Sequence, residues 1–215
     1  GQDSGVGILS LRSWALWMLG YPEAALVDAD HAIRDARGTG QSATLMYVLA
    51  NTILTHIWCR NYPTANAQVT ELVAMAAEKG AFLWKAAGIL ECGYLLLVTG
   101  KAADAIQTII SGNTAWHSTG STLAGPMYSS LLAKAYAELG KMDDAWRCIG
   151  DAITAVETTK ERFFEAEVHR IAGEIVLKSP QPDAAKAQEY FQRALEIARQ
   201  QQAKSWELRA AMSMA

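Results

Sequence analysis

The chain has 215 residues, of which 51% are hydrophobic and 19% are charged, so it can bury a substantial core and is neither disordered nor fibrous. Its 19 basic and 22 acidic residues give a net charge of -3. A chain of this charge lacks the broad positive field that attracts nucleic acid or an anionic membrane surface, so we expect neither as a partner.

No targeting signal is evident in the sequence. The first residues lack the basic region and long apolar stretch of a signal peptide, and the longest purely apolar run, residues 94–98, is far too short to span a bilayer. Cys59, Cys92 and Cys148 are odd in number and too widely spaced for a CxxC motif, which favours buried thiols in a reducing compartment. We therefore expect a cytoplasmic protein.

Apolar residues recur at intervals of three and four, the period of amphipathic helices, and turn motifs interrupt them about every 40 residues. Such a period predicts repeated helix-turn-helix units within a single domain, 1–215. In chain order we expect the repeats at 5–38, 42–80, 82–120, 123–159 and 161–202, with 204–215 beginning a further helix.

Alignment of the repeats on their turns brings small residues into columns, as needed where two helices touch. The second helices align Ala25, Ala67, Ala105, Ala145 and Ala187. Seven residues later they align Ala32, Ala74, Gly112, Ala152 and Ala194. The first helices align Ser13, Thr55, Gly93, Ala133 and Gly173. Three residues later comes a bulky column of Leu16, Trp58, Leu96, Tyr136 and Val176. The columns predict an all-α solenoid of about five antiparallel helix pairs.

The order small, large, turn glycine, alanine, alanine resembles the tetratricopeptide repeat, which stacks into a right-handed superhelix. The best match is "LLAKAYAELGKMDDAWRCIGDA" at 131–152. The period near 40 residues instead of 34 implies longer helices than in the standard repeat. Long-helix arrays of this kind are found in bacterial signalling proteins.

Four segments carry a second resemblance. Three of them are "GQDSGVGILSLRSWALWMLGYPEAAL", "AWHSTGSTLAGPMYSSLLAKAYAELGK" and "ERFFEAEVHRIAGEIVL". With "DAAKAQEYFQRALEIARQQQAKSWELRAAMSMA" they resemble the C-terminal helical region of bacterial class III adenylate/guanylate cyclase homologues that also carry a P-loop ATPase module. The resemblance implies that the chain is a fragment of a larger signalling protein. In that family the array is a non-catalytic regulatory or assembly region.

No motif for catalysis, metal or cofactor binding is evident. The segments "GKAAD" (100–104) and "GKMDD" (140–144) lack the rest of a phosphate-binding loop, and "GTGQSA" (38–43) joins two helices instead of following a strand. The four histidines form no HxxxH or HExxH pair and have no cysteine at ligand spacing. We expect no enzymatic activity of this chain, no metal and no cofactor.

In stacked helix pairs the first helices line the concave face, and the residue after each small position points into that groove. These residues are Trp14, His56, Tyr94, Lys134 and Glu174. One turn earlier lie Ser10, Thr52, Leu90, Ser130 and Arg170. The mixture of aromatic, basic and hydrogen-bonding groups suits a peptide or small ligand, although the same residues would also serve as half-buried packing groups.

Glu167, Arg170 and Glu174 are spaced by three and four residues, so they share a helix face and can form a ladder of ion pairs. An exposed ladder would stabilise the helix slightly, whereas a buried Arg170 would suit a partner's carboxylate.

The favoured function is a regulatory scaffold that binds a peptide or partner domain in its groove, with Ser130, Lys134, Arg170 and Glu174 as candidate contacts. A small-molecule effector sensor is the alternative, with a pocket lined by Trp14, Trp17, His56 and Tyr94. A third possibility is self-association into a homodimer through the last helix, an interpretation that expects Trp206 and Leu208 to lack a covering helix.

Overall fold

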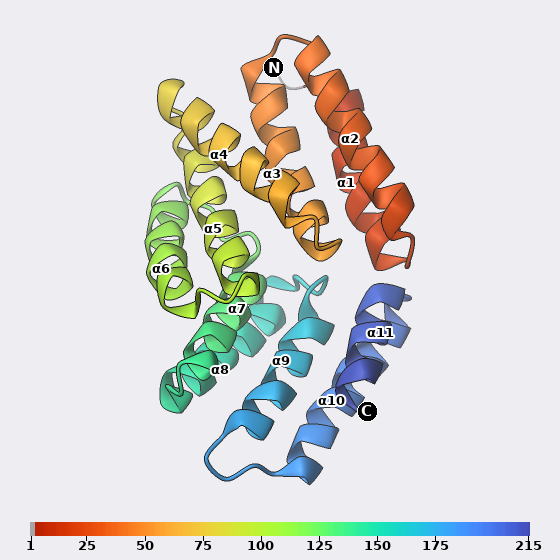
Figure 1. Ribbon diagram of the computed structural model, residues 1–215, viewed down its shortest axis with the longest axis vertical. Coiled ribbons are helices and arrows are strands. Elements are labelled where there is room, and N and C mark those ends of the chain that lie inside the picture. Colours follow the sequence, from red (N-terminus) through yellow and green to blue (C-terminus); the bar gives the residue numbers. More distant parts are fainter. Residues whose placement is uncertain (1–2) are drawn as a thin grey trace. The chain divides into compact units, whose positions relative to one another are not determined.

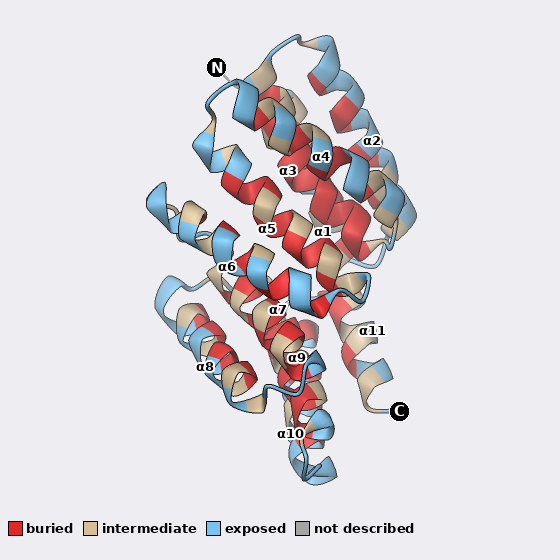
Figure 2. Ribbon diagram, turned by 60° about the vertical axis from the view of Figure 1, so that its left-hand side comes forward, coloured by how far each residue is buried: buried red, intermediate tan, exposed pale blue. Residues whose placement is uncertain are grey.

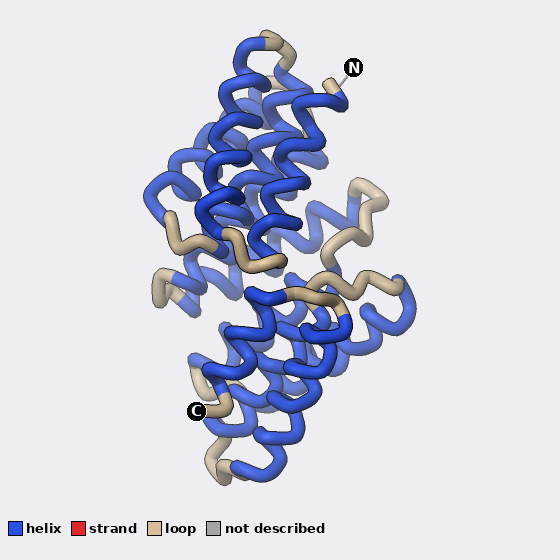
Figure 3. The backbone as a smooth tube through the Cα atoms, turned by 90° about the vertical axis from the view of Figure 1, so that its right-hand side faces the viewer, coloured by secondary structure: helices blue, strands red, loops and turns tan. Residues whose placement is uncertain are grey.

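The computed structural model describes residues 3–215, and over this range the chain forms only α-helices and the loops between them (Figure 3). None of the described helices is long and apolar enough to cross a membrane. The predicted all-α class, with five helix pairs and a further helix, is confirmed. In chain order (Figure 1) the helices are α1 (Ser4–Met18), α2 (Pro22–Gly38), α3 (Ser42–Trp58), α4 (Tyr62–Glu78), α5 (Phe82–Val98), α6 (Ala102–Ser118), α7 (Gly125–Glu138), α8 (Met142–Thr159), α9 (Glu165–Lys178), α10 (Ala184–Gln200) and α11 (Lys204–Ser213).

The helices belong to two compact units. The first unit contains the chain up to Leu95 together with Ile110–Ser121, and the second contains Leu96–Ile109 together with Thr122–Ala215. In the first unit α1 packs on α2, α3 packs on α4, and α3 also contacts α1 and α2. In the second unit α7 packs on α8 and α9 packs on α10, while α9 lies between α7 and α11. Each unit is therefore built from stacked helix pairs.

A left-handed backbone residue ends each helix from α1 to α8 at a spacing of 20 residues. Gly20, Gly40, Gly80, Gly100, Gly120 and Gly140 have positive φ, and Arg60 and Lys160 adopt the same conformation at φ 60° and 62°. The next position in this series is Pro180, whose ring fixes φ near -65° and so forbids the left-handed conformation. The loop 179–183 is accordingly longer than the three-residue loop 19–21, and the following left-handed residue is Gln202.

Arg60 explains one error in the predicted columns. The predicted columns place the turn of the second repeat at Tyr62, within "RNYP" (60–63), but its left-handed turn residue is Arg60, which no glycine marks. The alignment is therefore displaced by two residues. Ala67 and Ala74 are exposed, and the buried positions belong to Ala65 and Leu72, each 0% exposed.

Small residues in the other repeats do mark close helix contacts. Ala25, Ala105 and Ala145 are fully buried. A Cβ atom added to Gly112 would lie 2.8 Å from Leu90 Cδ2, so α5 and α6 approach each other there only because residue 112 has no side chain. Figure 2 shows buried residues running along the helices in stripes, as expected for stacked pairs.

N-terminal side-chain caps or first-turn prolines are found at the start of several helices. Asp3 caps α1 by accepting hydrogen bonds from the amides of Gly5 and Val6 at 2.9 and 3.2 Å, and Asp183 caps α10 by accepting one from Lys186. Proline lies in the first turn of α2, α4 and α7, where no intrahelical N–H bond is needed.

Candidate functional site

Charged residues connect the three adjacent helices α7, α9 and α11 of the second unit. We call this set the charged ribbon, and it consists of Lys134, Glu167, Arg170, Glu174 and Arg209. Lys134 Nζ lies 3.4 Å from Glu174 Oε2, and Arg209 Nη2 lies 2.6 Å from Glu167 Oε1. A continuous line of charge therefore crosses three helices.

The centre of the charged ribbon is a buried ion pair. Arg170 donates to both oxygens of Glu167, from Nε at 2.7 Å and from Nη2 at 2.8 Å. Burial by itself raises the pKa of Glu167, but the charges of Arg209 and Arg170 outweigh burial and lower that pKa to about 2. Glu167 is therefore ionised at neutral pH although it is almost inaccessible to solvent.

Arg170 directs two further hydrogen bonds to groups of this chain. Its Nη1 donates to a carboxylate oxygen of Glu174 and to Ser213 Oγ, the latter at 3.2 Å. The ladder of Glu167, Arg170 and Glu174 is thus present, with Arg170 buried inside it. Because four hydrogen bonds hold the guanidinium internally, the residues that can meet a partner are those at the rim of the charged ribbon.

Three side chains form that rim, one from each helix. The side chains of Lys134, Glu174 and Arg209 are 28%, 30% and 34% exposed. The ribbon as a whole has three cations and two carboxylates, which gives a net charge of plus one. Arg209 was missed by the sequence reasoning, although its position 42 residues after Glu167, about one repeat later, is a signal that pointed to it.

Tryptophans cluster in the first unit. Trp58 packs against Trp14 with ring centroids 5.5 Å apart and against Trp17 at 5.0 Å. Trp14 also donates from Nε1 to the backbone oxygen of Asn51 at 2.7 Å, which fixes α1 against α3. Trp17 and Trp58 are each 5% exposed and belong to the interior, whereas Trp14 is half-buried at the edge of this aromatic cluster.

The remaining predicted site residues are also inside the protein. His56 and Tyr94 are 1% and 3% exposed, and Ser130 is fully buried, donating to the backbone oxygen of Met127 at 2.8 Å. With Arg60 as the turn residue, His56 takes the place of the bulky column of the other repeats. Burial lowers the pKa of His56, so its imidazole is neutral at neutral pH.

Glu91 on α5 is another buried carboxyl group, and no sequence motif singles it out. It is 3% exposed, and among residues 3–215 no hydrogen-bond partner reaches its Oε2. Burial raises its pKa well above the ordinary value, with no cation to oppose the shift. Glu91 therefore favours the protonated form.

Residues typical of metal or nucleophilic chemistry are not grouped in the described part of the chain. There, no three His, Cys, Asp or Glu side chains are arranged so that they could hold a metal ion. Burial raises the pKa of Cys59 to about 11, so its thiol is not a ready nucleophile at neutral pH.

Comparison with known proteins supports the fold. The sequence matches no protein-family profile and no curated protein. Among solved structures, the chain is similar to the apo form of RapI, with a TM-score of 0.67 and 9% sequence identity over 99% of this chain and 84% of that one. At this identity the similarity establishes a shared helical-repeat fold.

Proposed function

We propose that this chain is a non-catalytic scaffold that binds an acidic segment of a partner protein at the rim of the charged ribbon. The observation that carries the proposal is the rim itself, in which three adjacent helices each present one partly exposed charged side chain. A surface shared by successive repeats suits an extended peptide, because each successive helix adds one contact along the length of the peptide.

The charge of the ribbon defines the partner's chemistry. Lys134 and Arg209 outnumber the one partly exposed carboxylate, Glu174. A partner carboxylate is therefore attracted by the two cations more than it is repelled by Glu174. Arg170 acts indirectly, since its hydrogen bonds position Glu174 and Glu167. Its role is to hold the rim in place and not to contact the partner.

The resemblance to cyclase homologues supplies the proposed context. The scaffold belongs to a bacterial nucleotide-cyclase-like signalling protein, and its partner is a segment of that protein or of one that regulates it. Nucleotide turnover by the purified chain alone would contradict the non-catalytic role.

A synthetic peptide array tests the proposal. Each scrambled 15-residue sequence is made in an acidic, a neutral and a basic version and probed with the purified chain. We expect the acidic versions to bind best, binding to weaken with added salt, and Lys134→Glu to reduce it about tenfold. Lys178→Glu is the matched control, because Lys178 is an exposed residue at the end of α9 outside the ribbon.

Equal binding of the three versions, or an unchanged affinity of the Lys134→Glu variant, contradicts the proposal. A circular dichroism melt of each variant verifies that the fold is retained, so that lost binding is not confused with unfolding.

A further inference from the structure

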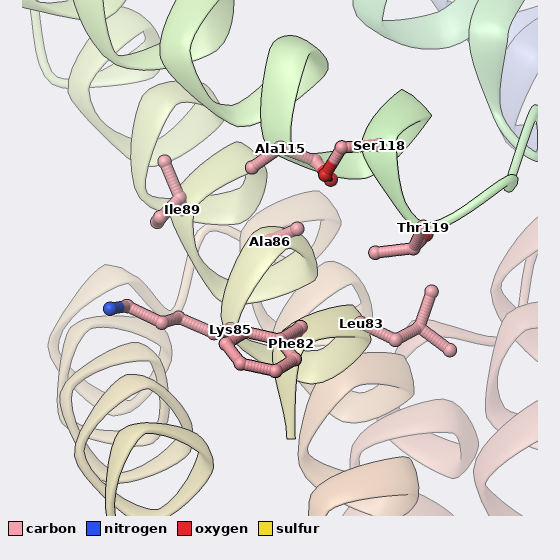
Figure 4. A pocket seen from close by; sticks show the side chains of 8 residues that line it. All are labelled: Phe82, Leu83, Lys85, Ala86, Ile89, Ala115, Ser118 and Thr119. Carbon is pink, nitrogen blue, oxygen red and sulfur yellow. The ribbon is translucent and has the colours of Figure 1, made fainter. Parts of the chain in front are cut away.

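A groove of about 610 Å³ lies within the first unit, between the first two turns of α5 and the end of α6 (Figure 4). We call it the α5–α6 groove. On the α5 side it is lined by Phe82, Leu83, Ala86 and Ile89, and Ala115, Ser118 and Thr119 at the end of α6 lie opposite them. This volume is within the range of sites that hold a ligand or a few side chains of a partner.

Large apolar side chains at the groove are left in contact with water. Phe82 is 77% exposed and Leu83 is 37% exposed. Exposed aromatic residues beside a concavity are typical of protein interfaces, where they provide much of the binding energy. The start of α5 therefore has the character of a docking surface.

The hydroxyl groups of Ser118 and Thr119 are directed toward the backbone at the end of α6. Ser118 Oγ donates to the backbone oxygen of Ala115 at 2.7 Å, and Thr119 Oγ1 donates to that of Trp116 at 2.6 Å. Both hydroxyl hydrogens are thus already used. The remaining donor in the lining is the ammonium group of Lys85.

Lys85 supplies the charge of the groove. Within the described range no carboxylate lies within ion-pair distance of it, and no other lining residue is charged. Figure 4 shows Lys85 and Leu83 extending in opposite directions from the start of α5. The groove therefore has an apolar end and a positive end.

We propose that the α5–α6 groove docks a segment of a partner protein that places an apolar side chain against Phe82 and Leu83 and an acidic side chain beside Lys85. Charge complementarity selects the acid, and the exposed aromatic ring selects the apolar neighbour. The inference rests on the proposed role as an interaction scaffold, but it uses a surface in the other unit from the charged ribbon.

A random 12-residue peptide library displayed on phage tests the docking site. The purified chain is the bait, and selected peptides are remeasured against variants. We expect enrichment of an apolar residue close to an acidic one, a loss of affinity of about tenfold or more for Phe82→Asp, and a smaller loss for Lys85→Glu. Val27→Asp is the matched control, since Val27 is a 56% exposed apolar residue on α2 of the same unit.

The outcomes separate the two proposals. Selected peptides whose binding Lys134→Glu abolishes and Phe82→Asp leaves unchanged overturn the groove inference but retain the charged ribbon. Failure to enrich any peptide overturns both. Binding of laurate that depends on Phe82, without peptide enrichment, assigns the groove to a free amphiphile and also overturns the inference.

Discussion

Two glutamates, one in each unit, are each 3% exposed, yet they are in opposite electrostatic situations. Glu167 in the second unit is held by Arg170 and Arg209, whereas no cation among residues 3–215 opposes the effect of burial on Glu91 in the first unit. The pKa of Glu167 is lowered and that of Glu91 is raised. Burial therefore sets the cost of a carboxyl group, but its neighbours decide whether the group is charged.

Removal of Arg170 tests the paired side of this comparison and has the largest expected effect. Arg170→Met leaves the buried Glu167 with Arg209 as its remaining ion-pair partner, so we expect the free energy of unfolding to fall by about 3–5 kcal/mol. Urea denaturation followed by circular dichroism measures the change. Arg193→Met is the control, because Arg193 is exposed and its nearest carboxylate contact is 3.8 Å long. A similar loss in both variants would show that the buried pair has no special role.

Acid should weaken the second unit through Glu167. Its pKa is about 2 in the folded state and 4.5 ordinarily, so the unfolded state binds the proton first as the pH falls. The stabilisation is complete above pH 4.5 and is lost as the pH falls toward 2, by an amount on the order of 3 kcal/mol. Urea midpoints at a series of pH values measure this loss, and Glu167→Gln should make the dependence smaller, leaving the part due to other carboxylates with lowered pKa values, such as Asp28 and Glu174. A wild-type midpoint that does not change between pH 5 and 3 would contradict the expectation.

Replacement of Glu91 tests the unpaired side. Glu91→Leu removes a buried carboxyl group whose Oε2 has no hydrogen-bond partner among the described residues, so we expect the free energy of unfolding to rise by about 1–3 kcal/mol at neutral pH. Because the folded pKa of Glu91 is raised, the wild type loses stability as the pH increases above 4.5, and the advantage of the variant should grow with it. Glu91→Gln remains polar and should gain less. A less stable Glu91→Leu protein would mean that the carboxyl group is held by a favourable interaction.

The rim of the charged ribbon should matter little for folding. Lys134 and Glu174 are both about 30% exposed and 3.4 Å apart, so Lys134→Gln should change the free energy of unfolding by no more than about 0.5 kcal/mol. The same urea assay, with Lys178→Gln as the reference, checks this. A loss of several kcal/mol would place Lys134 with Arg170 as a structural residue instead of a contact residue.

Much of the fold could be predicted because helix contacts impose a regular spacing of small residues. Ala105 and Ala145 are buried as the columns required, and the ladder from Glu167 to Glu174 follows from helical spacing alone. The second repeat was misaligned because Arg60 takes a left-handed conformation without being glycine. A left-handed conformation at a residue other than glycine cannot be predicted from the residue type.

The site was harder to predict, because it depends on packing between helices that are distant in sequence. Arg209 joins Glu167 only because α11 packs on α9, and the groove at Phe82 depends on the end of α6. Exposure was equally inaccessible, since His56 and Phe82 are both ring side chains on first helices and yet are 1% and 77% exposed. Sequence period assigns a residue to a helix face but does not show what covers that face.

The 20-residue rhythm of left-handed turn residues, interrupted at Pro180, has a consequence for changes in chain length. An inserted residue within a helix would rotate the rest of that helix by about 100° about its axis. The small residues and the residues beside them would then no longer face the neighbouring helix. The loop 179–183 already absorbs two additional residues while Ala187 and Ala194 remain buried. A peptide tag or fluorescent label inserted there should leave the helix pairs intact, which makes this loop the natural attachment point for a reporter.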